Sequence, residues 1–392
     1  MTSFFRWKLT VGWDSPSSGV MSHTHTGASL FASTFMIRTR CGSPSALNSD
    51  EVASASSGVI SVAASGAQHS AAGRAVADRS SRRLTVLVGL VTLVLFLLPW
   101  LAGRYPLYLA IQILILSVFS LGFNLLFGYT GLLSFGQAGF FAVGAYGCAK
   151  ILLVAPNLFL GLAGGVLSAG AAALVLGALS VRHTRIYFSM LTLAFGMMIY
   201  SIAWKWRDFT GGDDGLVGIP RAPLEIPGLG SLSVATMERY YYVVLVASLL
   251  AMLAMYRLVH SPLGLALQAI RDSEGRAEFA GVPVRTYRLI AFTIAGLYAG
   301  LAGALLPPLE NTVTPPIAHW STSAEPVMAT LMGGVHVFAG PIAGAFLFFM
   351  IKDVIVRFTE NWLIWLGAIV VALVMGFRGG VLSIFAERFL RR

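Results

Sequence analysis

Charged residues are scarce in this chain. Asp, Glu, Lys and Arg together make up 11% of the 392 residues, whereas 56% are hydrophobic, and the mean hydropathy is +0.77. This is too little charge to cover the surface of a water-soluble domain of that size. The composition therefore indicates a membrane protein.

The basic residues follow no pattern that suits a nucleic acid. The formal net charge is +10, but Lys and Arg lie mostly in short connectors between apolar runs. No basic stripe with interleaved aromatic residues is present. We therefore expect no nucleic-acid partner, and the basic residues serve instead to predict the orientation of the chain in a membrane.

Cysteine and lysine are rarer still. The two cysteines, Cys41 and Cys148, offer neither a disulfide framework nor a metal cluster, and the histidines lack the spacing of metal ligands. None of the lysines follows a glycine, so the phosphate-binding loop G-x-x-x-x-G-K-[ST] is absent. The sequence predicts no metal site and no cofactor. It also excludes ATP hydrolysis by that loop in this chain.

Acidic residues are missing from the clear apolar runs. Of the 17 acidic residues, Glu310, Glu325 and Asp353 come nearest, and each sits near the edge of an apolar segment. Carriers driven by protons or sodium usually keep a carboxylate at membrane depth. The sequence therefore disfavours an ion-coupled carrier.

Residues 1–80 differ in composition from the rest. They are rich in Ser, Ala, Gly and Thr, so they cannot bury enough apolar area to offset the entropy of ordering. We expect a disordered or dispensable N-terminal extension. A targeting peptide is one alternative, and a start codon placed too early, with Met21 and Met36 as internal candidates, is another. Residues 81–392 form the second predicted domain, which crosses the membrane.

Apolar runs long enough to cross a bilayer recur from Leu84 onward. Seven are clear, and two further regions, Glu325–Val356 and Trp362–Phe377, are apolar but irregular. We therefore predict an all-α, polytopic helix bundle with about 8–10 transmembrane or half-membrane helices, including broken ones. The seven runs are Leu84–Ala102, Leu107–Phe127, Ser134–Val154, Leu158–Ser180, Ile186–Trp206, Tyr240–Val259 and Tyr287–Leu306.

The arginines predict an orientation, because short loops rich in Lys and Arg stay on the cytoplasmic side. Arg79, Arg82 and Arg83 put the N-terminus inside. The loop 261–285 then also lies inside, and the segment 207–239 lies outside. The C-terminal arginines return to the cytoplasm only if Glu325–Val356 enters the membrane, breaks near Ala339 and returns as two short helices.

Polar, glycine-punctuated interruptions occur in both halves. One is "NLLFGYTGLLSFGQAGFFAVGAY", Asn124–Tyr146, and the other is "GGVHVFAGPIAGA", Gly333–Ala345. We expect Thr130, Ser134 and Gln137 to pair with backbone groups that a broken helix leaves free. Such interruptions point to the translocation route of a transporter. Small-residue packing between helices is the alternative.

The segment Ser261–Arg288 is the most distinctive soluble stretch. Ser261 is an expected helix cap, Pro262 suits the first helical position, and apolar residues follow at helical spacing. Gly281 is expected to end a second short helix at Arg276–Ala280. A short amphipathic helix between spans suits docking to another protein, whereas a solvated connector is the alternative.

Several long motifs in order resemble the permease subunits of ATP-binding-cassette importers for branched-chain amino acids. The resemblance covers roughly Leu84–Phe385. Besides the two interruptions, it is carried by "YFSMLTLAFG" at Tyr187–Gly196, "TGGDDGL" at Thr210–Leu216 and "SPLGLALQAIRDSEGRAEFAGV" at Ser261–Val282. Gln137 stands where His is frequent in the family, and His336 with Val337 replaces a Gly-Thr-like pair.

The resemblance implies partners: a homologous partner permease in a heterodimer, two cytoplasmic ATP-binding subunits, a periplasmic solute-binding protein and the lipid bilayer. It also implies that the loop 261–286 is a coupling loop that receives ATPase movement. Its matching residues are Gly264, Ala269, Arg271, Glu274 and Gly281. The motif with Thr210, Gly211, Gly212 and Asp213 resembles the family's outer loop.

The sequence predicts an inner-membrane permease powered by separate ATPase subunits, and the resemblance implies that it moves branched-chain amino acids into the cytoplasm. Its N- and C-termini are expected to be cytoplasmic. As a hypothesis, the substrate pathway is lined by Ser134, Gln137, Thr192 and His336. The alternatives are a permease for urea or short amides, an ion-coupled secondary carrier and a membrane scaffold without transport.

Overall fold

The computed structural model describes residues 92, 94–100, 103–183, 186–226, 230–359, 361–376 and 380. The extension predicted at 1–80, most of the first predicted span and both chain ends lie outside these residues. The folded unit that is described here falls within Leu84–Arg392.

Six helices in the described ranges are long and apolar enough to cross a membrane. The predicted helical bundle is therefore confirmed, and the helix ends differ from the predicted ones by a few residues, as at Met237 against Tyr240. The spans are α3 (Arg104–Asn124) with its π-helical continuation η1 (Leu125–Tyr129), α4 (Gln137–Val154), α5 (Leu158–Ser180), α6 (Ile186–Lys205), α8 (Met237–Val259) and α11 (Val284–Ala304).

The two irregular regions form three helices that are not among the six spans: α13 (Trp320–Gly333), α14 (Gly340–Phe358) and α15 (Trp362–Gly376). The break between α13 and α14 confirms the prediction of two helices joined near Ala339. At a rise of about 1.5 Å per residue, α13 is roughly 21 Å long, which is shorter than a bilayer core. Pro341 at the start of α14 suits a helix N-terminus.

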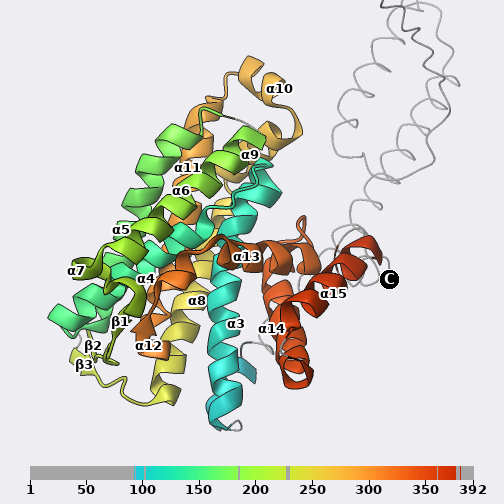
Figure 1. Ribbon diagram of the computed structural model, residues 1–392. Helices are drawn as coiled ribbons and strands as arrows, with labels where there is room; N and C mark the ends of the chain where they lie inside the picture. Colours follow the sequence, from blue (N-terminus) through green and yellow to red (C-terminus); the bar gives the residue numbers. More distant parts are fainter. Residues whose placement is uncertain are drawn as a thin grey trace, which may run out of the picture. The chain divides into compact units, whose positions relative to one another are not determined.

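Short elements gather at the two ends of the bundle. The helices α9 (Pro262–Asp272) and α10 (Glu274–Phe279) lie at one end, and α7 (Arg207–Thr210), β1 (Leu216–Val217), β2 (Leu224–Ile226), β3 (Gly230–Leu232) and α12 (Pro307–Glu310) lie at the other (Figure 1). β1 pairs antiparallel with β4 (Thr312–Val313), and β2 pairs with β3. The loop predicted to be cytoplasmic and the segment predicted to be outside thus lie at opposite ends.

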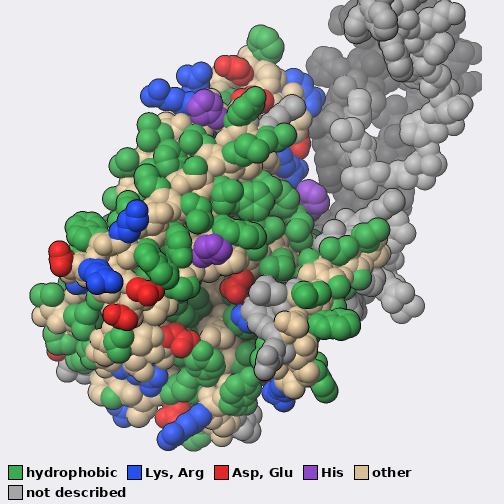
Figure 2. Space-filling view, in the orientation of Figure 1, with side chains coloured by type: hydrophobic (Ala, Val, Ile, Leu, Met, Phe, Trp, Pro, Cys, Tyr) green, Lys and Arg blue, Asp and Glu red, His purple; other side chains and the backbone are tan. Residues whose placement is uncertain are grey.

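Charged and hydrophobic side chains on the surface are distributed differently between the two ends and the middle of the bundle. Figure 2 shows hydrophobic side chains over much of the middle of the molecule, whereas Lys, Arg, Asp and Glu gather mostly toward the two ends. An apolar belt of this kind suits contact with lipid. Large side chains exposed in the belt include Leu174 on α5 and Leu250 on α8.

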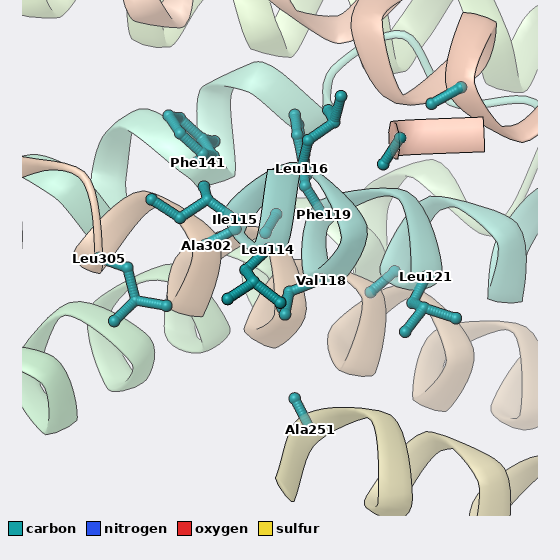
Figure 3. Packing of buried hydrophobic residues seen from close by; sticks show 14 of the residues in the cluster. Leu114, Ile115, Leu116, Val118, Phe119, Leu121, Phe141, Ala251, Ala302 and Leu305 are labelled. Carbon is teal, nitrogen blue, oxygen red and sulfur yellow. The ribbon is translucent and has the colours of Figure 1, made fainter. Parts of the chain in front are cut away.

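Helix α3 forms the centre of the core. With its continuation η1, it is the most buried of the six spans. Figure 3 shows Leu114, Ile115, Val118 and Phe119 of α3 beside Phe141 of α4 and Ala302 of α11. A helix that is apolar all round is expected to be buried on all sides, and here the neighbouring helices provide that burial.

Close backbone contact joins α4 to α11. A methyl group added at Gly144 would lie 2.3 Å from the carbonyl oxygen of Gly300, so no larger residue fits without displacement. This glycine therefore serves the packing role that the sequence left as the alternative to a role in transport.

Candidate functional site

The first interruption leaves its backbone to be satisfied by neighbouring helices. After η1, Gly131 adopts a left-handed φ of 71°, and the chain turns before α4 starts at Gln137. Thr192 Oγ1 on α6 accepts from Phe135 N (3.3 Å), and Ser189 Oγ donates to Leu133 O (2.6 Å). At the start of α4, Ala138 N donates to Ser323 Oγ of α13 (2.9 Å).

These contacts correct part of the prediction for this stretch. Thr130 Oγ1 does bond to the carbonyl of Leu126. Ser134 Oγ and both polar atoms of Gln137, however, are buried and have no hydrogen-bond partner among the described residues. The reason is that hydroxyl groups of α6 and α13 already satisfy the free backbone groups. A buried amide without a partner is costly, which marks Gln137 as a site of further interest.

The second interruption, at residues 334–339, touches the first. A methyl group added at Gly128 of η1 would lie 2.8 Å from the carbonyl oxygen of Val335. Gly334 has a φ of 117°, which favours glycine. Irregular backbone is tolerated in a membrane domain only where protein or a wet cavity covers it. Here each interruption helps to cover the other.

Arg271 of α9 reaches both interruptions. Its Nη1 donates to the carbonyl oxygen of Gly128 (2.6 Å) and lies 3.5 Å from Nδ1 of His336. Its Nη2 also pairs with the neighbouring Asp272. Because π-helical turns free backbone carbonyls from the regular α-helical pattern, Gly128 O is available to this charged donor. One side chain thus connects α9, the end of α3 and the break before α14.

Glu274 connects the same loop to α11. Its two carboxylate oxygens accept from Arg288 Nη1 (2.8 Å) and Nη2 (2.9 Å), and the Arg288 side chain is only 6% exposed. A bidentate pair of this kind fixes geometry as well as distance. The predicted coupling residues Arg271 and Glu274 therefore contact this chain itself.

We expect Glu274→Gln to destabilise the chain by about 2 kcal/mol, because the buried guanidinium of Arg288 would lose its charged partner. Thermal unfolding of the purified chain in nanodiscs measures this loss. Glu278→Gln, at an exposed glutamate on the same helix, serves as the control. Equal melting temperatures for the two variants would contradict a structural role for the Glu274–Arg288 pair.

The rest of the loop divides into an inner and an outer face. Gly264, Leu267 and Ile270 are buried, and Gly264 packs against the carbonyl of Val259 at the end of α8. Leu265 is 64% exposed and Phe279 96% exposed. These two apolar side chains are the strongest docking candidates on the loop. The sequence did not identify them, because composition does not show which apolar residues of an amphipathic segment are exposed.

The other predicted loop residues are accounted for as follows. Ala269 is exposed on α9. Gly281, at a φ of 84°, follows the end of α10 as predicted. The second helix begins at Glu274 rather than Arg276. Ser261 Oγ donates to Leu258 O (2.6 Å) and does not cap α9 with its side chain.

The outer motif forms a compact turn. Thr210 Oγ1 donates to Ala203 O and accepts from Gly212 N. Gly211 and Gly212 have φ values of 79° and 63°, so a side chain would strain the turn. Asp213 is exposed in the short 3-10 turn η2 (Gly212–Asp214). Thr210 therefore shapes the turn, and Asp213 is free to meet another molecule.

Glu325, which the sequence analysis places near the edge of an apolar segment, forms an ion pair with a lysine of α14. Helix α13 begins at Trp320 and includes Glu325, and it is not one of the six long spans. Glu325 Oε1 lies 3.4 Å from Lys352 Nζ of α14, and both side chains are between one quarter and one third exposed. The Lys352 ammonium also lies near the rings of Phe348 and Phe349.

No cluster of three or more possible metal ligands occurs within the described ranges. The features of the described residues that bear on function are therefore the two helix interruptions, the exposed apolar face of the loop and the Glu325–Lys352 pair. Such an arrangement suits movement of a solute between helices.

Comparisons with known proteins agree with this geometry. The family model described as "Branched-chain amino acid transport system / permease component" matches residues 105–383. The LivM permease of the high-affinity branched-chain amino acid transport system of Escherichia coli is 28% identical over 71% of this chain and 70% of its own length. A probable LivH permease of Methanocaldococcus jannaschii is 24% identical over 59% of this chain and 74% of its own length.

A putative glucose ABC transporter permease of Haloferax volcanii is also similar, at 28% identity over 45% of this chain and 54% of its own length. No solved structure gives a significant match. Because the family model covers well over half of the chain, the chain belongs to the family of permease components of branched-chain amino acid transport systems, whose members are membrane transport subunits rather than enzymes.

Proposed function

We propose that this chain is the permease subunit of an ATP-binding-cassette importer that moves branched-chain amino acids into the cytoplasm. The observation that carries the proposal is the reach of Arg271 from the loop at one end of the bundle to both interruptions. A movement imposed on α9 would be transmitted directly to η1 and to the break before α14.

The substrate pathway runs between the interruptions and along α6. Thr192 bonds to the loop before α4, and His336 is exposed beside Arg271. Ser134 and Gln137 are fully buried, so the passage at their level is closed in this conformation. Movement of α9 opens the passage and gives the amide of Gln137 a polar partner. Gln137 then has a contact in the open state that it lacks in the closed state, and such a difference can shift the equilibrium between the two states.

The partners follow from what the chain lacks. Without a phosphate-binding loop, the ATP-binding subunits are separate chains, and they dock on the face of α9 and α10 that carries Leu265 and Phe279. A homologous partner permease completes the membrane unit, and a solute-binding protein meets the opposite end, where Asp213 is exposed. The membrane is the bacterial inner membrane, with α9 on the cytoplasmic side.

Uptake of radiolabelled leucine tests the proposal. We expect vesicles with this chain, the partner permease, the ATPase subunits and the binding protein to take up leucine only with ATP, and to ignore a collapsed proton or sodium gradient. Uptake of urea in place of leucine would favour the short-amide alternative. Uptake by this chain alone, abolished by an ionophore, would overturn the proposal in favour of an ion-coupled carrier.

The introduction of charge into the loop tests the docking face separately. Leu265→Glu with Phe279→Glu is expected to abolish co-purification of the ATPase and to leave membrane insertion intact, because two charges would replace apolar contact area. Val217→Glu is the control, because Val217 is an exposed apolar residue of β1, at the end of the bundle opposite to α9 and α10. Retained ATPase in the double variant would show that the subunit docks elsewhere.

A further inference from the structure

The second interruption is contacted from α8 as well as from α9. The ring centroids of Tyr256, in the last turn of α8, and Phe338, in the break before α14, lie 5.3 Å apart, and the rings are inclined at 80°. An edge-to-face pair at this distance is favourable beyond the area that it buries. Tyr256 is 49% exposed, whereas Phe338 is half-buried against the hydrophobic core. The contact therefore lies at the edge of the core.

His260 supports Tyr256 at the end of α8. Its ring centroid lies 4.2 Å from that of Tyr256, and its Nδ1 lies 2.8 Å from the carbonyl oxygen of Tyr256. His260 is the C-cap residue of the helix, a position where a histidine can bond to the last helical carbonyls. The orientation of the Tyr256 ring is thus tied to the residue directly before the loop 261–286.

The joint between α8 and α9 is short and tightly packed. Only His260 and Ser261 separate the two helices, and Ser261 Oγ donates to Leu258 O (2.6 Å). A methyl group added at Gly264 would lie 2.0 Å from the carbonyl oxygen of Val259. Close-packed contacts of this kind transmit displacement rather than absorb it, so a movement of α9 is expected to carry the last turn of α8 with it.

Further from the loop, α8 is anchored to the rest of the bundle. Tyr298 Oη of α11 donates to the carbonyl oxygen of Ala251 (2.7 Å). Tyr298 itself packs against α3, because a methyl group added at Gly122 would lie 2.6 Å from its Cβ. The part of α8 that can follow α9 is therefore the stretch after Ala251, and Tyr256 lies within it.

Tyr256 and Arg271 meet the break at different points. Arg271 lies beside His336, and Tyr256 contacts Phe338, two residues later. A single contact fixes the position of a segment but leaves it free to rotate about that point, whereas two contacts also fix its orientation. The α8–α9 region thus holds the second interruption through one polar and one aromatic contact.

We propose that Tyr256 is a second positioning residue of the transport cycle, which sets the orientation of the second interruption through Phe338 when α9 moves. The proposal rests on the proposed function, because it concerns how movement of the loop reaches the passage. Phe338 lies two residues before the start of α14, so a shift of its ring changes the direction in which that helix begins.

The amount of leucine taken up per ATP hydrolysed by the complete transporter measures this role. Tyr256→Ala is expected to lower this ratio roughly two- to tenfold, the range for loss of an aromatic pair, while the ATPase stays bound. A purely structural defect would lower uptake and hydrolysis together and leave the ratio unchanged. Tyr256→Phe should keep the wild-type ratio, because the ring remains. Leu253→Ala, at another exposed apolar residue of α8, is the matched control and should keep it too.

A double variant separates this role from that of a membrane anchor. Tyrosines near helix ends also hold helices at the membrane interface, and an anchor would act independently of Phe338. We expect Phe338→Ala to lower the ratio as well, and Tyr256→Ala with Phe338→Ala to lower it no further than the more severe single variant does. An unchanged ratio in Tyr256→Ala, or single losses that multiply in the double variant, would overturn the proposal.

The outcome for the proposed function is read from the wild-type transporter. ATP-driven uptake of urea rather than leucine would contradict the proposed function and leave the role of Tyr256 open to the same measurement, with urea taken up per ATP as the ratio. Normal leucine uptake by the wild type with an unchanged ratio in Tyr256→Ala would contradict the role of Tyr256 alone.

Discussion

Replacing Arg271 with Ala is expected to remove most ATP-driven leucine uptake while the ATPase subunits stay bound. The guanidinium donates to Gly128 O at 2.6 Å and lies beside His336, so it contacts both interruptions and contributes little to the outer docking face. A hydrogen bond from a charged donor contributes about 1.5–3 kcal/mol. If the coupling between the loop and the interruptions loses this free energy, leucine uptake should fall roughly ten- to 100-fold.

The measurement is uptake in vesicles together with the ATPase content of the purified complex. Arg257→Ala, at an exposed arginine in the last turn of α8 and outside α9 and α10, is the matched control and should retain both. Arg271→Lys should recover part of the uptake, because the ammonium keeps the charge but lacks the second arm of the guanidinium. If Arg271→Ala lost the ATPase as well, Arg271 would act in docking rather than in transmission.

The second large effect is expected from Gly344→Ala. A methyl group at this position would lie 1.7 Å from the carbonyl oxygen of Ala329, so α14 could no longer pack on α13. Backbone atoms cannot move aside as the end of a flexible side chain can, and overpacking of this kind costs about 3 kcal/mol. We therefore expect a strong loss of folded, membrane-inserted protein and, with it, of uptake.

Gly367→Ala provides the comparison for this variant. Gly367 lies on α15, and a methyl group there would meet no atom within 4 Å. Size-exclusion profiles and melting temperatures in detergent should place Gly367→Ala with the wild type and Gly344→Ala well below it. A Gly344→Ala variant as stable as Gly367→Ala would mean that the two helices are not held together at this contact.

The sequence predicted the bundle well because hydrophobic length is a local property. The span Leu158–Ser180 was predicted at both ends, and the break between α13 and α14 followed from its glycines and from the arginines at the C-terminus. Hydropathy starts the irregular segment at Glu325, whereas the helix begins earlier, because it also includes the polar turn from Trp320.

The site was only partly predictable, because its contacts join residues that are far apart in the chain. The two interruptions, Arg271 and His336 were each identified, but nothing in the local pattern indicates that Arg271 reaches a carbonyl 143 positions away. In the same way, Glu274 has a suitable basic neighbour in Arg276, yet it pairs with Arg288. Such pairs depend on how the helices pack in three dimensions, and the composition of the sequence carries no information about that packing.

The most direct test of the account is the reactivity of a cysteine at position 137 in the complete transporter, with Cys41 and Cys148 replaced by Ala. Gln137 is fully buried here and has no hydrogen-bond partner among the described residues. The account predicts that a water-soluble maleimide labels this cysteine in one nucleotide state and not in the other. A cysteine that stayed sealed in every nucleotide state would contradict a passage between the two interruptions.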